Sequence, residues 1–342
     1  MLIERILSAG VLLTAATLAV MALQPETANA VPAPAALTLT VTPLPLDRDD
    51  PARAEVGALR FLGAVQMRST NPLFGGISGL RAGPGGRMLA VTDTGNWLAF
   101  TTTERGDRLV GVADAVLAAI PTPDGQPITS KAQGDAEALE WDAGTGGATI
   151  VYEQQHRMVQ FSGIDAARPA TLARQPDRTE FLTAMAGWPE NGGGEAMAVL
   201  PGGTRVIIAE HARRSDGSAP LLLTRSGTTT EHGLALIPGF SPTDAIAIDD
   251  TRILVLQRRF SPLGGWAAAL ALVDLAPMLG PSPPATPLPQ RELARLQAPL
   301  TFDNMEGLAI RHSGDRLFVY LVSDDNLNSL QRTLLMKFEL QL

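Results

Sequence analysis

The sequence predicts an all-β protein, a β-propeller of five to six four-stranded blades closed by strands from the N- and C-terminal ends. Three observations predict it. One short unit occurs five times along the chain, each copy pairs two apolar runs around a tight turn, and successive copies begin 49 to 62 residues apart. That spacing is the length of a four-stranded blade.

Each unit opens with an acidic or hydroxyl residue, then a small residue, then a large aliphatic one. A turn rich in Gly, Pro or Asp follows, and an apolar run then returns, as at Val206 to Ile208. Short β-branched runs between turn signals are typical of buried strands. The five openings begin at Ser78, Glu137, Glu195, Asp244 and Glu306.

The two ends of the repeat array predict how the ring closes. Leu334 to Leu340 has the pattern of a late strand of the last unit, and Arg60 to Met67 could complete the same sheet from the other end of the chain. The spacings leave room for a sixth blade, in the N-terminal region or between Gly264 and Pro299. A solenoid or a sandwich built from the same hairpins is the alternative.

The N-terminal region divides into two parts before the propeller domain of residues 55–342. Ile6 to Leu23 carries no charge, and Ala28-Asn29-Ala30 has the small-residue pattern of a cleavage site. Residues 1–30 are therefore predicted to be a signal peptide, which places the mature protein in the periplasm or outside the cell. An uncleaved membrane anchor is the alternative. Residues 31–54 are rich in Pro and Ala and are predicted to be a linker with an extended strand from Leu37 to Val41.

Composition excludes several classes of function. The 342 residues carry a net charge of −8 and contain no cysteine. The absence of cysteine excludes disulfides, thiol catalysis and thiolate metal sites. The negative charge argues against nucleic acid as a partner, and no segment beyond the signal region is apolar enough for stable membrane insertion. We expect a monomer.

Polar residues recur where each repeated hairpin begins and ends. The start of one antiparallel strand and the end of the next lie at the same edge of a sheet. The opening residues should therefore meet the residues that follow the return strands at one mouth of the channel. The residues that follow the return strands are Asp93, Glu153, Glu210, Gln257 and Asp324, and Arg258 and Arg259 come directly after Gln257.

Crowded carboxylates at one mouth suit a metal site or shared protons. On this basis we assign candidate catalytic residues at Glu137, Glu195 and Glu306. The candidate ligand-binding residues are Ser78, Asp93, Asp244, Arg258, Arg259 and Asp324, and the candidate metal ligands are Glu137, Glu153, Glu195, Glu210 and Glu306. The alternative is that the carboxylates only join neighbouring blades by bonds to backbone N–H groups or to Arg.

Several motifs in order resemble the phytase-like domain family, the "esterase-like activity of phytase" proteins. They are Ile77-Ser78-Gly79-Leu80 with Val91 to Gly95, Gly194 to Gly203 with Ala209-Glu210, Gln257-Arg258-Arg259, and Asp303 to Ala309. The resemblance covers about residues 60 to 342 and implies an exported propeller with an esterase or phosphoesterase activity. Ala196 stands where the family tends to have Gly, and Gln257 where an acid is expected.

The sequence supports two hypotheses about the function of the protein. The first is a Ca²⁺-assisted hydrolase of a small phosphate or carboxylic ester, with carboxylates holding the metal and Arg258 or Arg259 orienting the anion. The second is a non-catalytic exported binding or scaffold propeller for an anionic or peptide ligand. Neither a nucleophile elbow nor a phosphate loop is present, because Leu80 replaces the second glycine of the elbow and no Lys follows Gly192 to Gly194.

Overall fold

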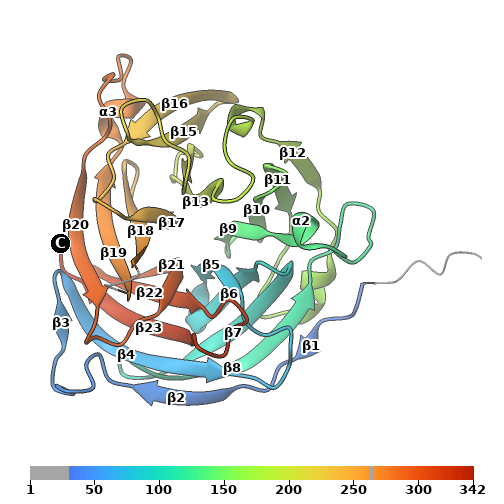
Figure 1. Cartoon of the computed structure of the whole chain (residues 1–342). Helices are drawn as coiled ribbons and strands as arrows, with labels where there is room; N and C mark the ends of the chain where they lie inside the picture. The colour runs from blue at the N-terminus through green and yellow to red at the C-terminus, as the bar shows by residue number, and fades with distance from the viewer. Residues whose placement is uncertain (1–30, 262–264) are drawn as a thin grey trace, which may run out of the picture. The chain divides into compact units, whose positions relative to one another are not determined.

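A computed structural model describes residues 31–261 and 265–342, and the predicted signal peptide lies outside them. Five antiparallel sheets form a closed ring around one channel (Figure 1). The inner strand of each sheet contacts the inner strands of the sheets on both sides. This confirms the β-propeller and fixes the number of blades at five. The propeller has little helix in the described residues: α2 (Lys131–Gly134), α3 (Ala276–Leu279) and the 3-10 turns η1 (Pro84–Gly86), η2 (Pro169–Ala173) and η3 (Thr183–Met185).

Blades 1 to 3 follow one another along the chain, each starting at the channel and ending at the rim. Blade 1 consists of β5 (Ile77–Ala82), β6 (Arg87–Thr92), β7 (Asn96–Arg105) and β8 (Arg108–Ala119). Blade 2 consists of β9 (Ala136–Asp142), β10 (Gly147–Tyr152), β11 (Arg157–Phe161) and β12 (Arg178–Phe181). Blade 3 consists of β13 (Gly194–Val199), β14 (Arg205–Ala209), β15 (Ala219–Arg225) and β16 (Thr228–Leu234).

Blades 4 and 5 complete the ring, and the last blade joins both ends of the chain. Blade 4 consists of β17 (Ser241–Ala247), β18 (Arg252–Ser261), β19 (Gly265–Asp274) and β20 (Gln290–Gln297). Blade 5 consists of β21 (Asn304–Ser313), β22 (Arg316–Asp324), β23 (Thr333–Leu340) and β4 (Leu59–Arg68). Because β4 pairs with β23, the N-terminal strand closes the ring as the sequence predicted.

Much of the predicted linker is paired with the ring. β1 (Ala35–Ala36) lengthens blade 1 by pairing with β8, and β2 (Thr40–Leu44) pairs with β4 on blade 5. The extended strand expected at residues 37–41 thus lies at residues 40–44. A short β3 (Glu55–Val56) folds back on β4. Among the described residues, none of the helices is long and apolar enough to cross a membrane.

The small residue of each repeated opening has a packing reason, because inner strands of adjacent blades approach closely. A Cβ added to Gly79 would lie 3.0 Å from Cβ of Leu139 in blade 2. A Cβ added to Gly307 would lie 3.1 Å from Cβ of Leu80 in blade 1 and 2.6 Å from Val322. Larger side chains at these positions would push the blades apart.

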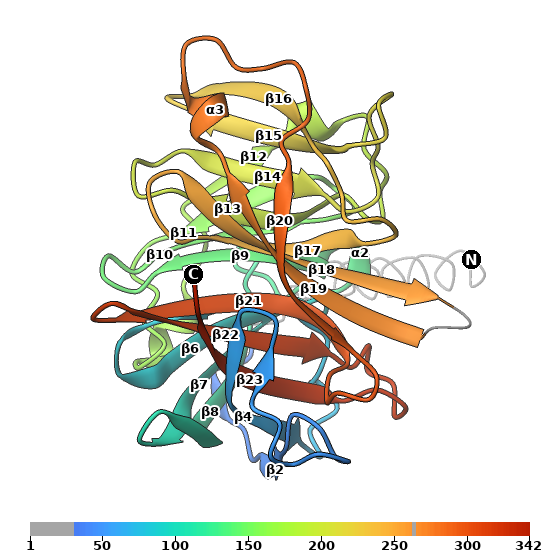
Figure 2. The same cartoon turned by 90° about the vertical axis from the view of Figure 1, so that its left-hand side faces the viewer.

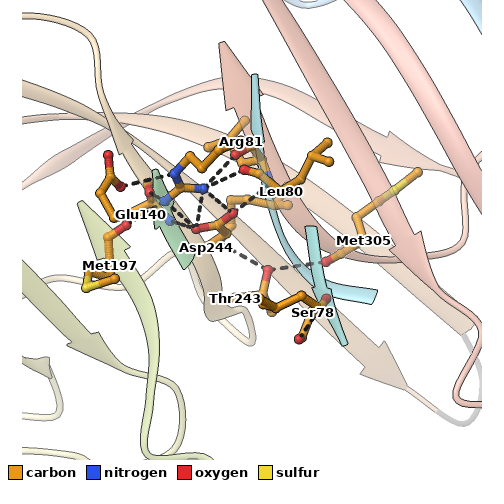
Figure 3. A network of polar contacts seen from close by, with 12 residues as sticks. Ser78, Leu80, Arg81, Glu140, Met197, Thr243, Asp244 and Met305 are labelled. Atoms are coloured by element: carbon orange, nitrogen blue, oxygen red, sulfur yellow. Dashed lines mark hydrogen bonds and ion pairs between the residues drawn. The ribbon is translucent and has the colours of Figure 1, made fainter. Parts of the chain in front are cut away.

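Arg81 of β5 bonds to residues of all five blades, and Figure 3 shows its contacts with Leu80, Glu140, Met197 and Asp244. Its guanidinium is 2% exposed and donates to the carbonyl of Leu80 in its own blade and to Glu140 of blade 2. It also donates to the carbonyls of Met197 in blade 3, Ala245 in blade 4 and Leu308 in blade 5. These four carbonyls occupy equivalent positions in the repeat.

Asp244 neutralises Arg81 inside the channel. Its carboxylate is fully buried, lies 2.9 Å from Nη1 of Arg81, and accepts from the backbone N–H of Leu308 at 2.7 Å. Arg81 comes three residues after Ser78, which places it about 10 Å along the strand from the mouth. The pair therefore closes the channel below the mouth, and we call the end of the channel above this floor the cup.

Candidate functional site

A β-bulge marks the mouth end of every inner strand. The pairing register shifts by one residue in all five blades, as between Ile77 and Gly79 in β5 and between Met305 and Gly307 in β21. A bulge leaves its extra residue outside the ladder and turns its side chain to a new direction. The bulged residues are Ser78, Glu137, Glu195, Thr243 and Glu306.

The bulge corrects the predicted alignment of blade 4 by one residue. Thr243 is the bulged residue there, and Asp244 follows it at the position where the other blades have Gly or Ala. Correspondingly, Gln257 pairs with Pro242 inside the ladder, and Arg258 takes the next position. Arg258 is therefore the structural equivalent of Asp93, Glu153, Glu210 and Asp324.

Three positions in each blade face this end of the channel: one two residues before the bulge, the bulged residue, and the residue after the return strand. Together they hold eight carboxyl groups and a single guanidinium, that of Arg258. The fifteen residues, blade by blade, are Gly76, Ser78 and Asp93; Asp135, Glu137 and Glu153; Gly193, Glu195 and Glu210; Ser241, Thr243 and Arg258; and Asn304, Glu306 and Asp324.

The two hydroxyl residues at bulges join neighbouring blades. Ser78 Oγ donates to the carbonyl of Ala136, and Thr243 Oγ1 donates to the carbonyl of Met305 at 3.2 Å. Both side chains are buried. Ser78, predicted to bind a ligand, thus already has a partner within the ring.

Asp135, Glu137 and Glu153 of blade 2 form the tightest acidic cluster among the described residues. One carboxylate oxygen from each lies within 4.8 Å of the other two. Oδ1 of Asp135 is buried and accepts no hydrogen bond, although Nζ of the exposed Lys131 lies 3.4 Å away. Glu153 Oε1 accepts from the backbone N–H groups of Gly192 and Gly193, which leaves its other oxygen for the cluster.

This cluster has the geometry of an oxygen-ligated cation site. Two oxygens that bind one Ca²⁺ at about 2.3–2.6 Å can lie at most about 5 Å apart. The separations in the cluster satisfy that limit. Burial is the main cause that raises the pKa of the Glu137 carboxyl well above its ordinary value, and the charges of Asp135, Glu153 and Glu306 add to it. A cation would relieve this repulsion.

Glu195 of blade 3 is a buried carboxyl without a partner. Its side chain is 6% exposed and makes no hydrogen bond or ion pair with any described residue. Burial raises the pKa of Glu195 well above its ordinary value, and the charges of Glu210 and Glu137 raise it further. A carboxyl that keeps its proton near neutral pH can act as a general acid.

Arg258 links blades 3, 4 and 5 across the mouth. Its Nη2 lies 3.1 Å from Glu210, its Nη1 lies 2.6 Å from Glu306, and the same Nη1 donates to Asn304 at 2.8 Å. Burial still raises the pKa of Glu306, to about 8, although Arg258 opposes that shift. Because its donors are occupied by protein groups, Arg258 orients two carboxylates and is not free to bind an anion.

The blade 1 and blade 5 side of the mouth holds Asp93 and Asp324. Burial raises the pKa of both carboxyls, that of Asp324 to about 7; the charge of Asp325 adds to both shifts, and the charge of Asp93 adds to that of Asp324. Oδ1 of Asp93 is buried without a hydrogen bond, and its Oδ2 lies 3.4 Å from Lys131. These two carboxyls extend the acidic surface of the cup around the ring.

The structure places the predicted glutamates at the same mouth, along with Asp93, Arg258 and Asp324, but of the five predicted metal ligands only Glu137 and Glu153 lie in the three-carboxylate cluster. It places two other predicted residues elsewhere. Asp244 lies in the floor with Arg81, and Arg259 stacks on the ring of Phe240, 5.0 Å from its centroid. Successive residues of a strand face opposite sides, so Arg258 and Arg259 cannot share the mouth.

Two residues of the cup were missed from the sequence, Asp135 and Asn304. They occupy equivalent positions two residues before Glu137 and Glu306. The shared pattern of a polar residue, an apolar residue and Glu, in Asp135-Ala136-Glu137 and Asn304-Met305-Glu306, was the signal that could have found them.

A comparison with known protein families shows to which family the chain belongs. The model of the phytase-like family, described as "esterase-like activity of phytase", matches residues 72–327. The chain belongs to the phytase-like family. The match spans the inner strands of all five blades, so the family pattern coincides with the cup. No curated protein matches this phytase-like chain.

Solved structures resemble the phytase-like propeller only at low identity. The WD40 β-propeller domain of Doa1 is 8% identical, with coverage of 78% of this chain and 93% of that one and a TM-score of 0.37. A glycoside hydrolase family 43 β-xylosidase/α-arabinofuranosidase from a compost microbial metagenome is 10% identical, with coverage of 82% and 94% and a TM-score of 0.42. An exported protein described as putative, from Bacteroides fragilis, is 8% identical, with coverage of 86% and 97% and a TM-score of 0.36. These likenesses carry no argument about the function of this chain.

Proposed function

We propose that this phytase-like propeller is an exported hydrolase of a small ester, which works at the acidic cup with the help of Ca²⁺. The observation that carries the proposal is the combination of a three-carboxylate cluster with an adjacent, partnerless and buried carboxyl, Glu195. Crowded carboxyls of perturbed pKa are typical of catalytic centres. Export is supported by the predicted signal peptide.

Asp135, Glu137 and Glu153 would hold the Ca²⁺, because their oxygens meet the distance limit for a shared cation. When bound, the ion would polarise the carbonyl or phosphoryl oxygen of the ester. Burial and the neighbouring charges favour the protonated form of the Glu195 carboxyl, which would donate its proton to the leaving-group oxygen as water adds to the ester and the bond to that oxygen breaks. Arg258 and Asn304 hold Glu306 in place, and the charge of Glu210 favours the protonated form of Glu195.

An assay of esters tests the proposal. We expect the purified mature protein to hydrolyse at least one member of a panel of carboxylic and phosphate esters, more rapidly with Ca²⁺ than with a chelator. Glu195→Gln keeps the size of the side chain but removes the proton, so it should lower kcat by about 100-fold or more. Rates are measured by titration of the released acid.

Glu292→Gln is the matched control, because Glu292 pairs with Arg295 on the outer strand of blade 4 and is not part of the cup. It should leave the rate unchanged. Unchanged kcat in Glu195→Gln, or a wild-type protein that hydrolyses none of the esters, would defeat the proposal.

A binding propeller without catalysis is the second candidate. Eight carboxyl groups against one half-buried guanidinium favour a cationic ligand, such as a basic peptide, over an anionic ligand. Occupation of Arg258 by Glu210, Glu306 and Asn304 points the same way. Saturable binding of a basic peptide by a protein that hydrolyses no ester would support this second function.

A further inference from the structure

An apolar cavity adjoins the acidic cup on the side of blades 4 and 5. It has a volume of about 520 Å³, within the range of small-molecule sites, and its apolar walls are Phe260, Trp266, Phe302 and Leu330. Phe260 is 60% exposed and Leu330 is 88% exposed. Large apolar side chains gathered at a hollow of the surface indicate a binding site.

The cavity wall is built by strands that continue past the mouth. β18 passes Arg258 at the mouth and runs on to Phe260, which pairs with Trp266 of β19. Figure 2 shows this hairpin reaching beyond the other blades. The rings of Phe260 and Trp266 lie 4.9 Å apart. The two rings are tilted by 50° to each other, and the strand pairing holds this wall without a ligand.

Arg258 joins the cavity to the cup. Its guanidinium lies 5.8 Å from the ring centroid of Trp266 on one side and bonds to Glu306 on the other. A ligand with its polar end in the cup would therefore have its remaining part beside Trp266. Asp303, the acidic residue of the cavity, is paired with Arg332 at 3.1 Å and offers no free charge.

The charge of the cup restricts the polar end of that ligand. The single cation among the fifteen positions of the cup, the guanidinium of Arg258, is already occupied by Glu210 and Glu306, so a polyanion would find no free cation there. Taking several phosphate charges out of water without a partner cation costs much free energy. The cup therefore discriminates against compounds that carry many phosphates.

We infer that the substrate is an uncharged or cationic carboxylic ester with an aromatic or similarly bulky apolar group, which sits between Trp266 and Leu330, and that polyphosphorylated compounds are excluded. This inference rests on the proposed function and narrows it from esters in general to one class. Phe260, Trp266 and Leu330 then set specificity, and the carboxylates of the cup set the chemistry.

Hydrolysis of two esters that differ only in the apolar group tests the inference. Benzyl acetate should have a KM at least tenfold lower than that of methyl acetate in the wild-type protein. Trp266→Ala should raise the KM for benzyl acetate by roughly tenfold, the scale of a lost aromatic contact with its buried area, and should change the KM for methyl acetate much less. Leu330→Ala, at a side chain that is 88% exposed, should have the same effect without a risk to folding. Phe181→Ala is the control, because Phe181 is 65% exposed on β12 of blade 2, away from the cavity.

Calorimetric binding separates this inference from the proposed function. Benzylammonium should bind to the wild-type protein and lose most of its affinity in Trp266→Ala, and inositol hexakisphosphate should not bind. If no ester is hydrolysed and benzylammonium still binds in this way, the hydrolase proposal fails and the ligand class stands. Tighter binding of inositol hexakisphosphate, or equal discrimination between the two acetates in the wild type and both cavity variants, would overturn the inference.

Discussion

Arg81→Met should destabilise the propeller more than any other single substitution considered for it. The change would leave the carboxylate of Asp244 buried without its cation, and it would remove donors from carbonyls in four blades. Removing one partner of a buried ion pair costs about 3–5 kcal/mol. Chemical denaturation should therefore show a loss of about that size in the free energy of unfolding.

Two further variants test the cause of that loss. Arg81→Met combined with Asp244→Asn removes both charges and should recover part of the stability, because no unpaired charge remains buried. Arg295→Met removes a surface partner of Glu292 and should cost less than about 1 kcal/mol. A loss below about 1 kcal/mol for Arg81→Met itself would show that the floor does not hold the five blades together.

In the absence of divalent cations, the propeller should lose stability as the pH rises from about 5 to 8. Burial raises the pKa of Asp324 to about 7 and those of Glu137 and Glu195 well above their ordinary values. An unfolded chain would lose these protons near pH 4. Between the two pKa values the folded state binds more protons, so the free energy of unfolding falls with increasing pH.

The slope is measured by denaturation in a chelator at pH 5, 6, 7 and 8. The double variant Glu137→Gln/Glu195→Gln has no proton to lose at either position, so its slope should be much smaller and its stability at pH 8 should exceed that of the wild type. Stability that rises over this range, or equal slopes in the two proteins, would contradict the assignment of these carboxyls as buried and crowded.

Much of the ring could be predicted from the sequence because a propeller blade is a local structure. The hairpin pattern at Leu317 to Tyr320, its partner at Leu334 to Leu340 and the closing strand at Arg60 to Met67 all depend on alternation and turns within short segments. The convergence of Glu137, Glu195 and Glu306 followed from the antiparallel geometry of those hairpins. Each of these inferences needed only neighbouring residues.

The register of blade 4 could not be predicted with the same accuracy. A β-bulge adds one residue to a strand, and both Thr243-Asp244-Ala245 and Asp244-Ala245-Ile246 fit the pattern of a polar, then a small or short, then an apolar residue. The choice between them decides whether Gln257 or Arg258 faces the mouth. Thr243 contacts Met305, 62 residues away in the sequence, and that contact settles the register only in the folded ring.

The floor of the cup could not be predicted from the sequence either. Arg81 follows Leu80 in a strand that otherwise contains small and apolar residues, and a local reading gives it no partner. Its partners lie 59 residues away at Glu140 and 163 residues away at Asp244. A side chain that bonds to all five blades has no local signature, because the closure of the ring creates its environment.

Calcium titration by calorimetry, at pH 8 in a buffer free of other divalent cations, tests the central claim that the cup holds a cation. Wild-type protein should bind Ca²⁺ saturably below about 1 mM, the weaker limit for extracellular calcium sites, and should release protons as it does so. Glu137→Gln should abolish the binding, and Glu292→Gln should retain it. Absence of saturable binding by the wild type, or equal binding by Glu137→Gln, would contradict the claim.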